Sequence, residues 1–266
     1  MKSWAFVLAL VFGLISFACE SARAAEAAAP GPAPVARGPF ADWAAVVIAG
    51  DYHAAHSDHQ TEAFDNARRD VSTALEKLGF SAANLREFSV RPERYPDTKP
   101  LKSDIQTIYD TLKDLSAKAP GGCLVYYSSH GAPQGVVLGD ALLPPGLLDE
   151  LITQTCGRKP TVVIISACFS GVFVPVLADG NRMILTAARP DRSSFGCSES
   201  DKYPYFDTCF LKVLSTVRDF VALGEAVQAC VADRERETGM SPPSEPQLSV
   251  GAQLRPSLQL YLFPTG

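Results

Sequence analysis

The chain alternates between short apolar runs and segments in which apolar residues recur every three or four positions. The runs have the length and branched content of strands buried on both faces; they are 44–49, 85–90, 123–127, 162–165 and 182–186. The periodic segments predict helices over 61–78, 101–115, 147–155, 173–177, 206–217 and 220–236. Strands that alternate with helices are typical of βαβ units. The pattern therefore predicts one α/β domain over residues 40–266, with a mostly parallel sheet between two helical layers.

Two further segments fit this domain less regularly. Residues 135–143 alternate weakly around Gly139-Asp140 and predict a small hairpin. In the tail, Leu258, Leu260 and Leu262 alternate with other residues, which predicts one or two late strands.

The first 39 residues do not follow the pattern of the domain. Residues 1–24 combine Lys2, an apolar stretch and the A-x-A sequence Ala22-Arg23-Ala24, so they predict a cleaved signal peptide. Residues 25–39 are rich in Ala, Pro and Gly and predict an extended lead-in. Anchoring as a lipoprotein through Cys19 is a weaker alternative, because the residues before it make a poor lipobox. We expect an exported protein, periplasmic or secreted, whose mature chain has no membrane span.

Charge and cysteine content indicate which partners, disulfides and cofactors to expect. The formal net charge of the 266 residues is −5, and no basic patch stands out, so nucleic acid is not expected as a partner. After the signal peptide six cysteines remain, an even number that favours disulfides in an exported protein. Their spacing contains no C-x-x-C motif, and we expect neither a metal nor a cofactor. If Cys168 is free, at least one other cysteine is unpaired.

Two of the predicted strands end in reactive residues. The run 123–127 leads into His130-Gly131, and the run 162–165 leads into Cys168. If the strands are parallel neighbours, both side chains lie at the carboxyl edge of the sheet, where α/β proteins form their sites. Cysteine peptidases need a thiolate nucleophile beside an imidazole that accepts and returns protons. Cys168 as a buried apolar residue and His130 as a core or loop histidine are the alternatives.

The surroundings and the order of these residues refine the hypothesis. A helix beginning behind Cys168 would favour the thiolate, and the backbone N–H groups of Gly131 and Cys168 could form an oxyanion hole. All four histidines precede Cys168. That order excludes papain-like enzymes and α/β-hydrolases, in which the histidine follows the nucleophile.

Four segments resemble blocks of the legumain (asparaginyl endopeptidase) family, in particular its bacterial members. They are Phe64–Asp70, Tyr126–Gly131, Ile165–Gly171 and Ile184–Cys197. That family belongs with the caspases, so the resemblance implies a caspase-like three-layer sandwich. It also implies a cysteine peptidase or transpeptidase that acts on a peptide or protein, with His130 as base and Cys168 as nucleophile.

The resemblance also suggests a substrate pocket, although some of its residues differ from those of the family. Residues at or near the family's pocket positions are His53, His56, Ser166, Ser193, Ser194 and Asp207. Ser166 replaces an acidic residue of legumain, and the family's basic pocket residues have no clean match. A preference for Asn or Asp at the cleavage site therefore does not follow.

Alternatives stay open for the histidine-rich loop and for the activity. His53, His56 and His59 could line the substrate pocket, bind zinc together with Asp51 and Asp58, or be solvated. For the whole chain we expect an endopeptidase that forms a thioester acyl-enzyme. A transamidase using the same dyad and a catalytically silent binding domain are the rival hypotheses.

Overall fold

The computed structural model describes residues 38–55, 59–258 and 260–264. The predicted signal peptide, most of the lead-in and His56 lie outside these residues. Within them the main sheet has the strand order β10-β9-β8-β4-β1-β2-β3, and every neighbouring pair is parallel except β10 with β9. The strands are β1 (Trp43–Ala49), β2 (Leu85–Ser89), β3 (Leu101–Lys102), β4 (Gly122–Ser128), β8 (Thr161–Ser166), β9 (Arg182–Thr186) and β10 (Gln247–Val250).

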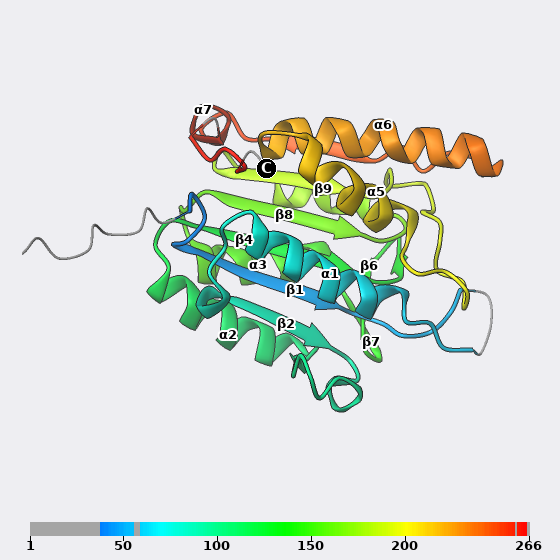
Figure 1. Ribbon diagram of the computed structural model, residues 1–266, viewed down its shortest axis with the longest axis horizontal. Helices are drawn as coiled ribbons and strands as arrows, with labels where there is room; N and C mark the ends of the chain where they lie inside the picture. Colours follow the sequence, from blue (N-terminus) through cyan, green and yellow to red (C-terminus); the bar gives the residue numbers. More distant parts are fainter. Residues whose placement is uncertain (1–37, 56–58, 259, 265–266) are drawn as a thin grey trace, which may run out of the picture. The chain divides into compact units, whose positions relative to one another are not determined.

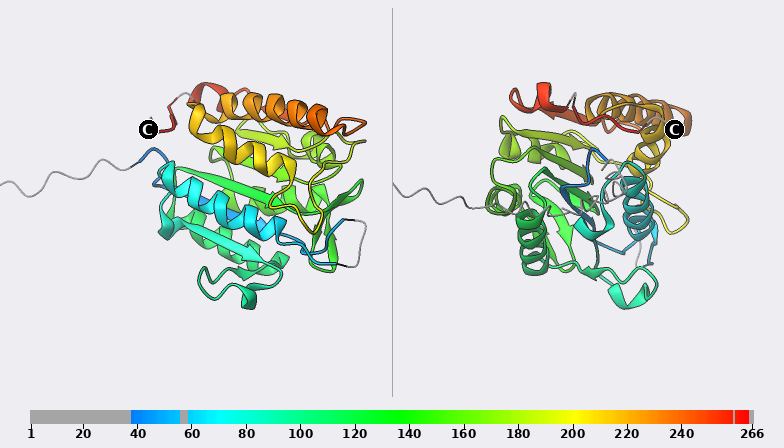
Figure 2. Two further views of the ribbon diagram at one scale, coloured as in Figure 1. Left: turned by 45° about the vertical axis from the view of Figure 1, so that its right-hand side comes forward. Right: turned by 60° about the vertical axis from the view of Figure 1, so that its left-hand side comes forward.

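Helices cover both faces of this sheet (Figures 1 and 2). One face packs against α1 (Ala63–Lys77), α5 (Tyr205–Val213), α6 (Phe220–Thr238) and α7 (Leu254–Leu258). The other packs against α2 (Ile105–Lys118), α3 (Pro145–Cys156) and α4 (Val174–Leu177). Each face has its own apolar core because β1, β4 and β8 are buried along their whole length and send alternate side chains to opposite sides.

Short elements complete the described chain. The predicted hairpin is a three-stranded antiparallel sheet of β5 (Gly131–Ala132), β6 (Gly135–Leu138) and β7 (Ala141–Leu143). Single 3-10 turns occur at Ala82–Asn84, Pro92–Arg94, Ser170–Phe173 and Leu214–Thr216. No helix in the described part of the chain is both long enough and apolar enough to cross a bilayer.

The structure corrects three details of the sequence prediction. The late strand is β10, not the segment around Leu260, because Leu258 ends α7 with its side chain buried. Residues 101–102, expected to begin a helix, instead extend the sheet as β3 beside β2. The helix predicted over 206–217 ends at Val213 and continues as a 3-10 turn.

Candidate active site

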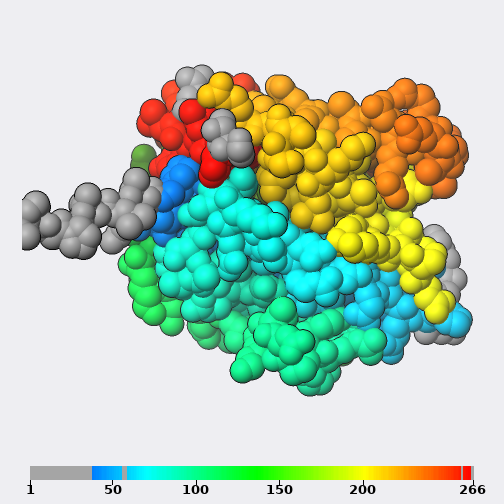
Figure 3. All heavy atoms as spheres, viewed as in Figure 1, coloured from blue at the N-terminus to red at the C-terminus, as the bar shows by residue number. Residues whose placement is uncertain are grey.

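His130 and Cys168 are brought to one edge by paired strands. β4 and β8 are parallel neighbours, and Ser128 pairs with Ser166 in their register. His130 and Cys168 each lie two residues beyond this pair, so both follow the carboxyl ends of their strands. Both line one cavity of about 860 Å³, together with His53, Gly131, Ser193 and Ser194. Figure 3 shows, at its right, that the segment after β9 (yellow) lies beside the segment after β1 (light blue). There the Ala55 N–H donates to the Cys197 carbonyl at 2.8 Å.

The backbone turns sharply just after Cys168. Phe169 has a φ of +56°, the left-handed region that non-glycine residues seldom adopt. Its N–H donates to the Arg192 carbonyl at 2.8 Å, which holds the turn against the segment after β9. The helix expected behind Cys168 is only a 3-10 turn over Ser170–Phe173 followed by the single turn of α4. The helix dipole of a long regular helix therefore cannot be invoked for this thiol.

Gly131 packs directly against the segment that contains Cys168. A Cβ added to Gly131 would lie 2.1 Å from the Cys168 carbonyl oxygen and 3.1 Å from the Ala167 Cβ. Real Cβ atoms do not approach a carbonyl oxygen so closely, so this position requires glycine. The backbones of the two residues assigned to the oxyanion hole are thus in contact.

The Cys168 thiol faces the segment that follows β9. The Ser194 N–H donates to Cys168 Sγ at 3.2 Å, and Sγ lies 3.5 Å from the Ser194 carbonyl oxygen and 3.7 Å from Ser194 Oγ. The sulfur thus accepts the N–H of Ser194 and lies within donating distance of the carbonyl oxygen of the same residue. Ser193 and Ser194 both line the cavity, and Ser194 also contacts the Cys168 thiol.

His130 is oriented by a backbone carbonyl. Its Nε2 lies 2.9 Å from the His53 carbonyl oxygen, and its ring forms a T-shaped pair with the Phe64 ring at a centroid separation of 5.0 Å. A carbonyl oxygen only accepts hydrogen bonds, so Nε2 carries the proton in the neutral ring. This tautomer leaves Nδ1 with a free lone pair, which is what a general base requires.

Asp51 supports the segment that carries this carbonyl. Its buried Oδ1 accepts the N–H of Tyr52 at 2.7 Å, the N–H of His53 at 3.1 Å and the His53 Nδ1 at 2.7 Å. Sequence reasoning named Asp51 only in the zinc hypothesis. Within the described residues no group of three or more His, Cys, Asp or Glu side chains is arranged to hold a metal ion. His59 lies 3.4 Å from Glu199.

Two of the predicted substrate-binding residues lie below the cavity and do not line it. Ser166 and Asp207 are 1% and 0% exposed. The Asp207 carboxylate accepts hydrogen bonds from Tyr126 Oη at 2.6 Å, from Ser128 Oγ at 3.3 Å and from Ser166 Oγ. Burial raises the pKa of Asp207 to about 6, although the three hydroxyl donors oppose that shift. Ser166 and Asp207 are therefore not placed to contact a substrate in this cavity.

Sequence reasoning missed other parts of the cavity wall. Phe195, Cys197, Tyr205 and Met240 line it as well. Cys197 is unpaired and buried, and burial raises the pKa of its thiol well above the ordinary value. The position of Cys197 in the block that ends Ser-Ser-Phe-Gly-Cys was the available signal, whereas nothing in the sequence pointed to Met240.

The other four cysteines of the described chain form disulfides. Cys123 is bonded to Cys156, which joins β4 to the end of α3, and Cys209 is bonded to Cys230, which joins α5 to α6. The unpaired cysteines are Cys168 and Cys197, so the expectation of a second unpaired thiol is confirmed.

Comparison with known proteins agrees with this architecture. A family model described as the peptidase C13 family matches residues 89–225. Among solved structures, caspase-1 from Spodoptera frugiperda has a TM-score of 0.57 at 17% identity, with 86% of this chain and 94% of that chain covered. A structure described as pro-sf-caspase-1 has a TM-score of 0.54 at 16% identity, with 78% and 90% covered. These likenesses confirm the predicted caspase-like fold. A search of curated protein sequences finds no significant match.

Proposed function

Because the chain belongs to the peptidase C13 family, we propose that it is an exported cysteine endopeptidase with His130 as general base and Cys168 as nucleophile. The family and the fold support a cysteine peptidase that acts on protein. The observation that carries the residue assignment is the convergence of His130 and Cys168 in one cavity from the ends of paired strands. The hydrogen bond of His130 Nε2 to the His53 carbonyl leaves Nδ1 as the ring atom that can accept a proton, and the Ser194 N–H contacts Cys168 Sγ.

The reaction proceeds in two half-reactions. His130 Nδ1 accepts the thiol proton, and Cys168 Sγ forms a bond to the carbonyl carbon of the substrate. Backbone N–H groups of Gly131 and Cys168 stabilise the resulting oxyanion. The C–N bond then breaks as His130 gives its proton to the amine, which leaves a thioester. Water attacks the thioester with His130 as base, the C–S bond breaks, and the carboxylic acid product and the free thiol are released.

Replacement of the nucleophile tests this assignment. A Cys168→Ala variant should lose peptide cleavage and the rapid iodoacetamide labelling of the wild-type protein, while a Cys197→Ala variant should keep both. Cleavage by the Cys168→Ala variant would refute the assignment, and labelling of Cys168 no faster than an ordinary thiol would favour a silent binding domain. Cleavage in the presence of a peptide amine separates the rival activities, because a ligated product indicates transamidation and a free carboxylate indicates hydrolysis.

Export is supported by the two disulfides, since such bonds persist in oxidising compartments. Expression of the full chain in a bacterium with a Sec pathway should give a periplasmic or secreted protein whose N-terminal residue is Ala25. A cytosolic product that retains Met1 would contradict this proposal, and mass attached as lipid at Cys19 would replace it with the anchored form.

A further inference from the structure

The residue that orients His130 belongs to a short antiparallel ladder after β1. Its first limb is Tyr52–Ala54 and its second limb is His59–Thr61. Thr61 N–H donates to the Tyr52 carbonyl at 2.8 Å, Ala54 N–H donates to the His59 carbonyl at 2.8 Å, and His53 bridges to Gln60. The two limbs are thus fixed to each other on both sides of His53.

This ladder determines where the His53 carbonyl points. In an antiparallel pair the polar backbone groups of successive residues alternate between the partner strand and the opposite side. The Tyr52 carbonyl and the Ala54 N–H bond to the second limb, so the N–H and the carbonyl of His53, which lie between them, point away from it. Accordingly, His53 N–H donates to Asp51, and its carbonyl accepts from His130 Nε2. The orientation of His130 therefore depends on how the ladder is held.

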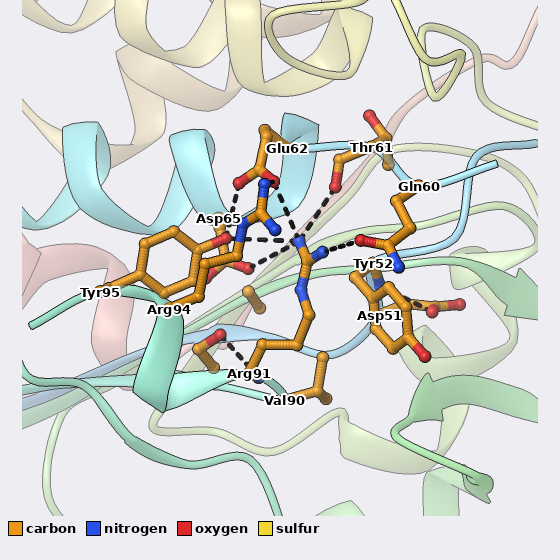
Figure 4. Close-up of polar contacts among 12 residues, drawn as sticks. Asp51, Tyr52, Gln60, Thr61, Glu62, Asp65, Val90, Arg91, Arg94 and Tyr95 are labelled. Carbon is orange, nitrogen blue, oxygen red and sulfur yellow. Dashed lines mark hydrogen bonds and ion pairs between the residues drawn. The ribbon is translucent and has the colours of Figure 1, made fainter.

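Arg91 holds the ladder from outside (Figure 4). It follows β2, and its side chain is only 11% exposed. On the second limb, Nη1 donates to Gln60 Oε1 at 2.8 Å and Nη2 donates to the Thr61 carbonyl at 3.2 Å. On the first limb, the guanidinium lies over the Tyr52 ring, 4.5 Å from its centroid. One planar cation thus contacts both limbs at the base of the ladder.

A small cluster fixes Arg91 in turn. Nη2 also lies 3.4 Å from Glu62 Oε1 and 3.3 Å from Tyr95 Oη, and Tyr95 Oη donates to Glu62 Oε2 at 2.6 Å. The Tyr52 ring that Arg91 covers lies against the His53 imidazole, with 4.1 Å between ring centroids. Contacts therefore run without a gap from Arg91 through Tyr52 and His53 to His130.

We propose that Arg91 is a positioning residue for His130: it clamps the ladder and so holds the His53 carbonyl on Nε2 of the base. The proposal rests on the proposed role of His130 as base. Arg91 does not line the cavity and touches no reacting group. A lysine at this position could keep an ion pair with Glu62 but cannot stack flat on Tyr52 while donating in fixed directions to Gln60 and Thr61.

Arg94 provides a matched control. Its Nη2 lies 2.9 Å from the same Glu62 carboxylate, and its side chain is 53% exposed. Among the described contacts Arg94 has none with Tyr52, Gln60 or Thr61. Arg94→Ala thus removes a positive charge beside Glu62 and leaves the clamp in place.

The test compares Arg91→Ala, Arg91→Lys and Arg94→Ala by kinetics, with kcat expressed per alkylatable Cys168. Both Arg91 variants should lower kcat on the order of 10-fold or more, because a displaced base costs rate, with little change in KM. Arg94→Ala should match the wild type. If Arg91 only stabilises the fold, its variants should have a lower thermal midpoint and fewer Cys168 thiols that can be alkylated, but the wild-type kcat per alkylatable Cys168. That result would overturn the proposal. Equal losses in Arg94→Ala and Arg91→Ala would overturn it as well.

Nitrogen-15 NMR of the histidine rings gives a readout that does not require turnover. With four histidines in the chain, His130 can be assigned by single His→Gln substitutions. In the wild type, neutral His130 should be the Nε2–H tautomer, and in Arg91→Ala it should be a mixture of tautomers. An unchanged tautomer in Arg91→Ala refutes the clamp. If the wild type cleaves no peptide, the proposed function fails. The tautomer of His130 in the wild type and in Arg91→Ala still shows whether Arg91 positions the His130 ring. If Arg91→Ala does not fold, Gln60→Ala removes one contact of the same clamp and should show the same two effects.

Discussion

At the scale of single residues, the candidate site depends on backbone positions as much as on the two reactive side chains. Gly131 leaves no room for a Cβ against the Cys168 carbonyl, and Phe169 adopts a left-handed conformation to turn the chain behind the thiol. These features bring the His130 and Cys168 segments together. A substitution that separates the two backbones should therefore affect catalysis more than stability.

Gly131→Ala tests this view. The new Cβ would lie 2.1 Å from the Cys168 carbonyl oxygen, so one segment must move. We expect kcat/KM for peptide cleavage to fall on the order of 100-fold, because small displacements of catalytic groups cost that much. Gly146→Ala is the control, since no atom lies within 4 Å of its added Cβ. Wild-type kcat/KM in the Gly131→Ala variant would show that the close contact is dispensable.

The juxtaposition of His130 and Cys168 could be predicted from sequence because both follow strand ends, and parallel strands end at a common edge. Their surroundings could not. The assignment of Ser166 and Asp207 to the pocket failed because strand and helix orientation turn both side chains inward, where they bond to each other. Asp51 was overlooked as a support because its role is to accept backbone N–H groups, which no side-chain pattern records.

At the scale of elements, Asp207 joins the layers of the fold below the cavity. It lies in the first turn of α5 and accepts hydroxyl hydrogen bonds from Tyr126 and Ser128 on β4 and from Ser166 on β8. A buried carboxylate in such a junction loses its hydration, and hydroxyl donors replace only part of it. The junction should therefore make stability depend on pH.

We expect Asp207→Asn to remove part of this pH dependence. Burial raises the folded-state pKa of Asp207 from 3.8 to about 6, so the folded protein holds this proton more tightly than the unfolded chain does. Its contribution to stability is complete below about pH 4 and is lost as the pH rises through about 6. Between pH 4 and 7 the free energy of unfolding should shift in favour of the variant by up to about 3 kcal/mol.

Urea unfolding of both proteins with disulfides intact, followed by circular dichroism across this pH range, measures the shift. Asp140→Asn controls for the loss of one negative charge, because Asp140 is exposed at the turn between β6 and β7. Parallel pH profiles for the wild type and Asp207→Asn would contradict the raised pKa.

Elements with strong periodicity or a continuous apolar run were predictable, and the irregular ones were not. β1, β4, β8 and β9 are buried on both faces, which is what their apolar runs indicate. β10 is only half-buried at the sheet edge, and its sequence Gln-Leu-Ser-Val has no such run. The alternation around Leu260 misled because tertiary packing places Leu258 in a short helix.

At the scale of the whole molecule, the cysteines divide into two classes by location. The disulfides lie away from the cavity, one within each apolar layer, and join secondary-structure elements across 33 and 21 residues of sequence. Cross-links of this length typically stabilise a fold by about 2–4 kcal/mol. Both unpaired cysteines line the cavity, but only Cys168 is partly exposed. The two unpaired thiols of the described chain thus share one cavity, and only one of them is accessible from it.

This division predicts the alkylation pattern of the mature protein. Native protein at pH 7.5 should take up one iodoacetamide label, at Cys168, because burial and a raised pKa keep Cys197 both covered and protonated. Denaturation without reductant should raise the count to two, and reduction should raise it to six, the number of cysteines that follow the proposed signal peptide. A Cys168→Ser variant should give none, one and five labels under the same three conditions. Intact mass measurement reads these numbers directly. Native labelling of Cys197, or four labels before reduction, would contradict the assignment of thiols and disulfides on which the active-site proposal depends.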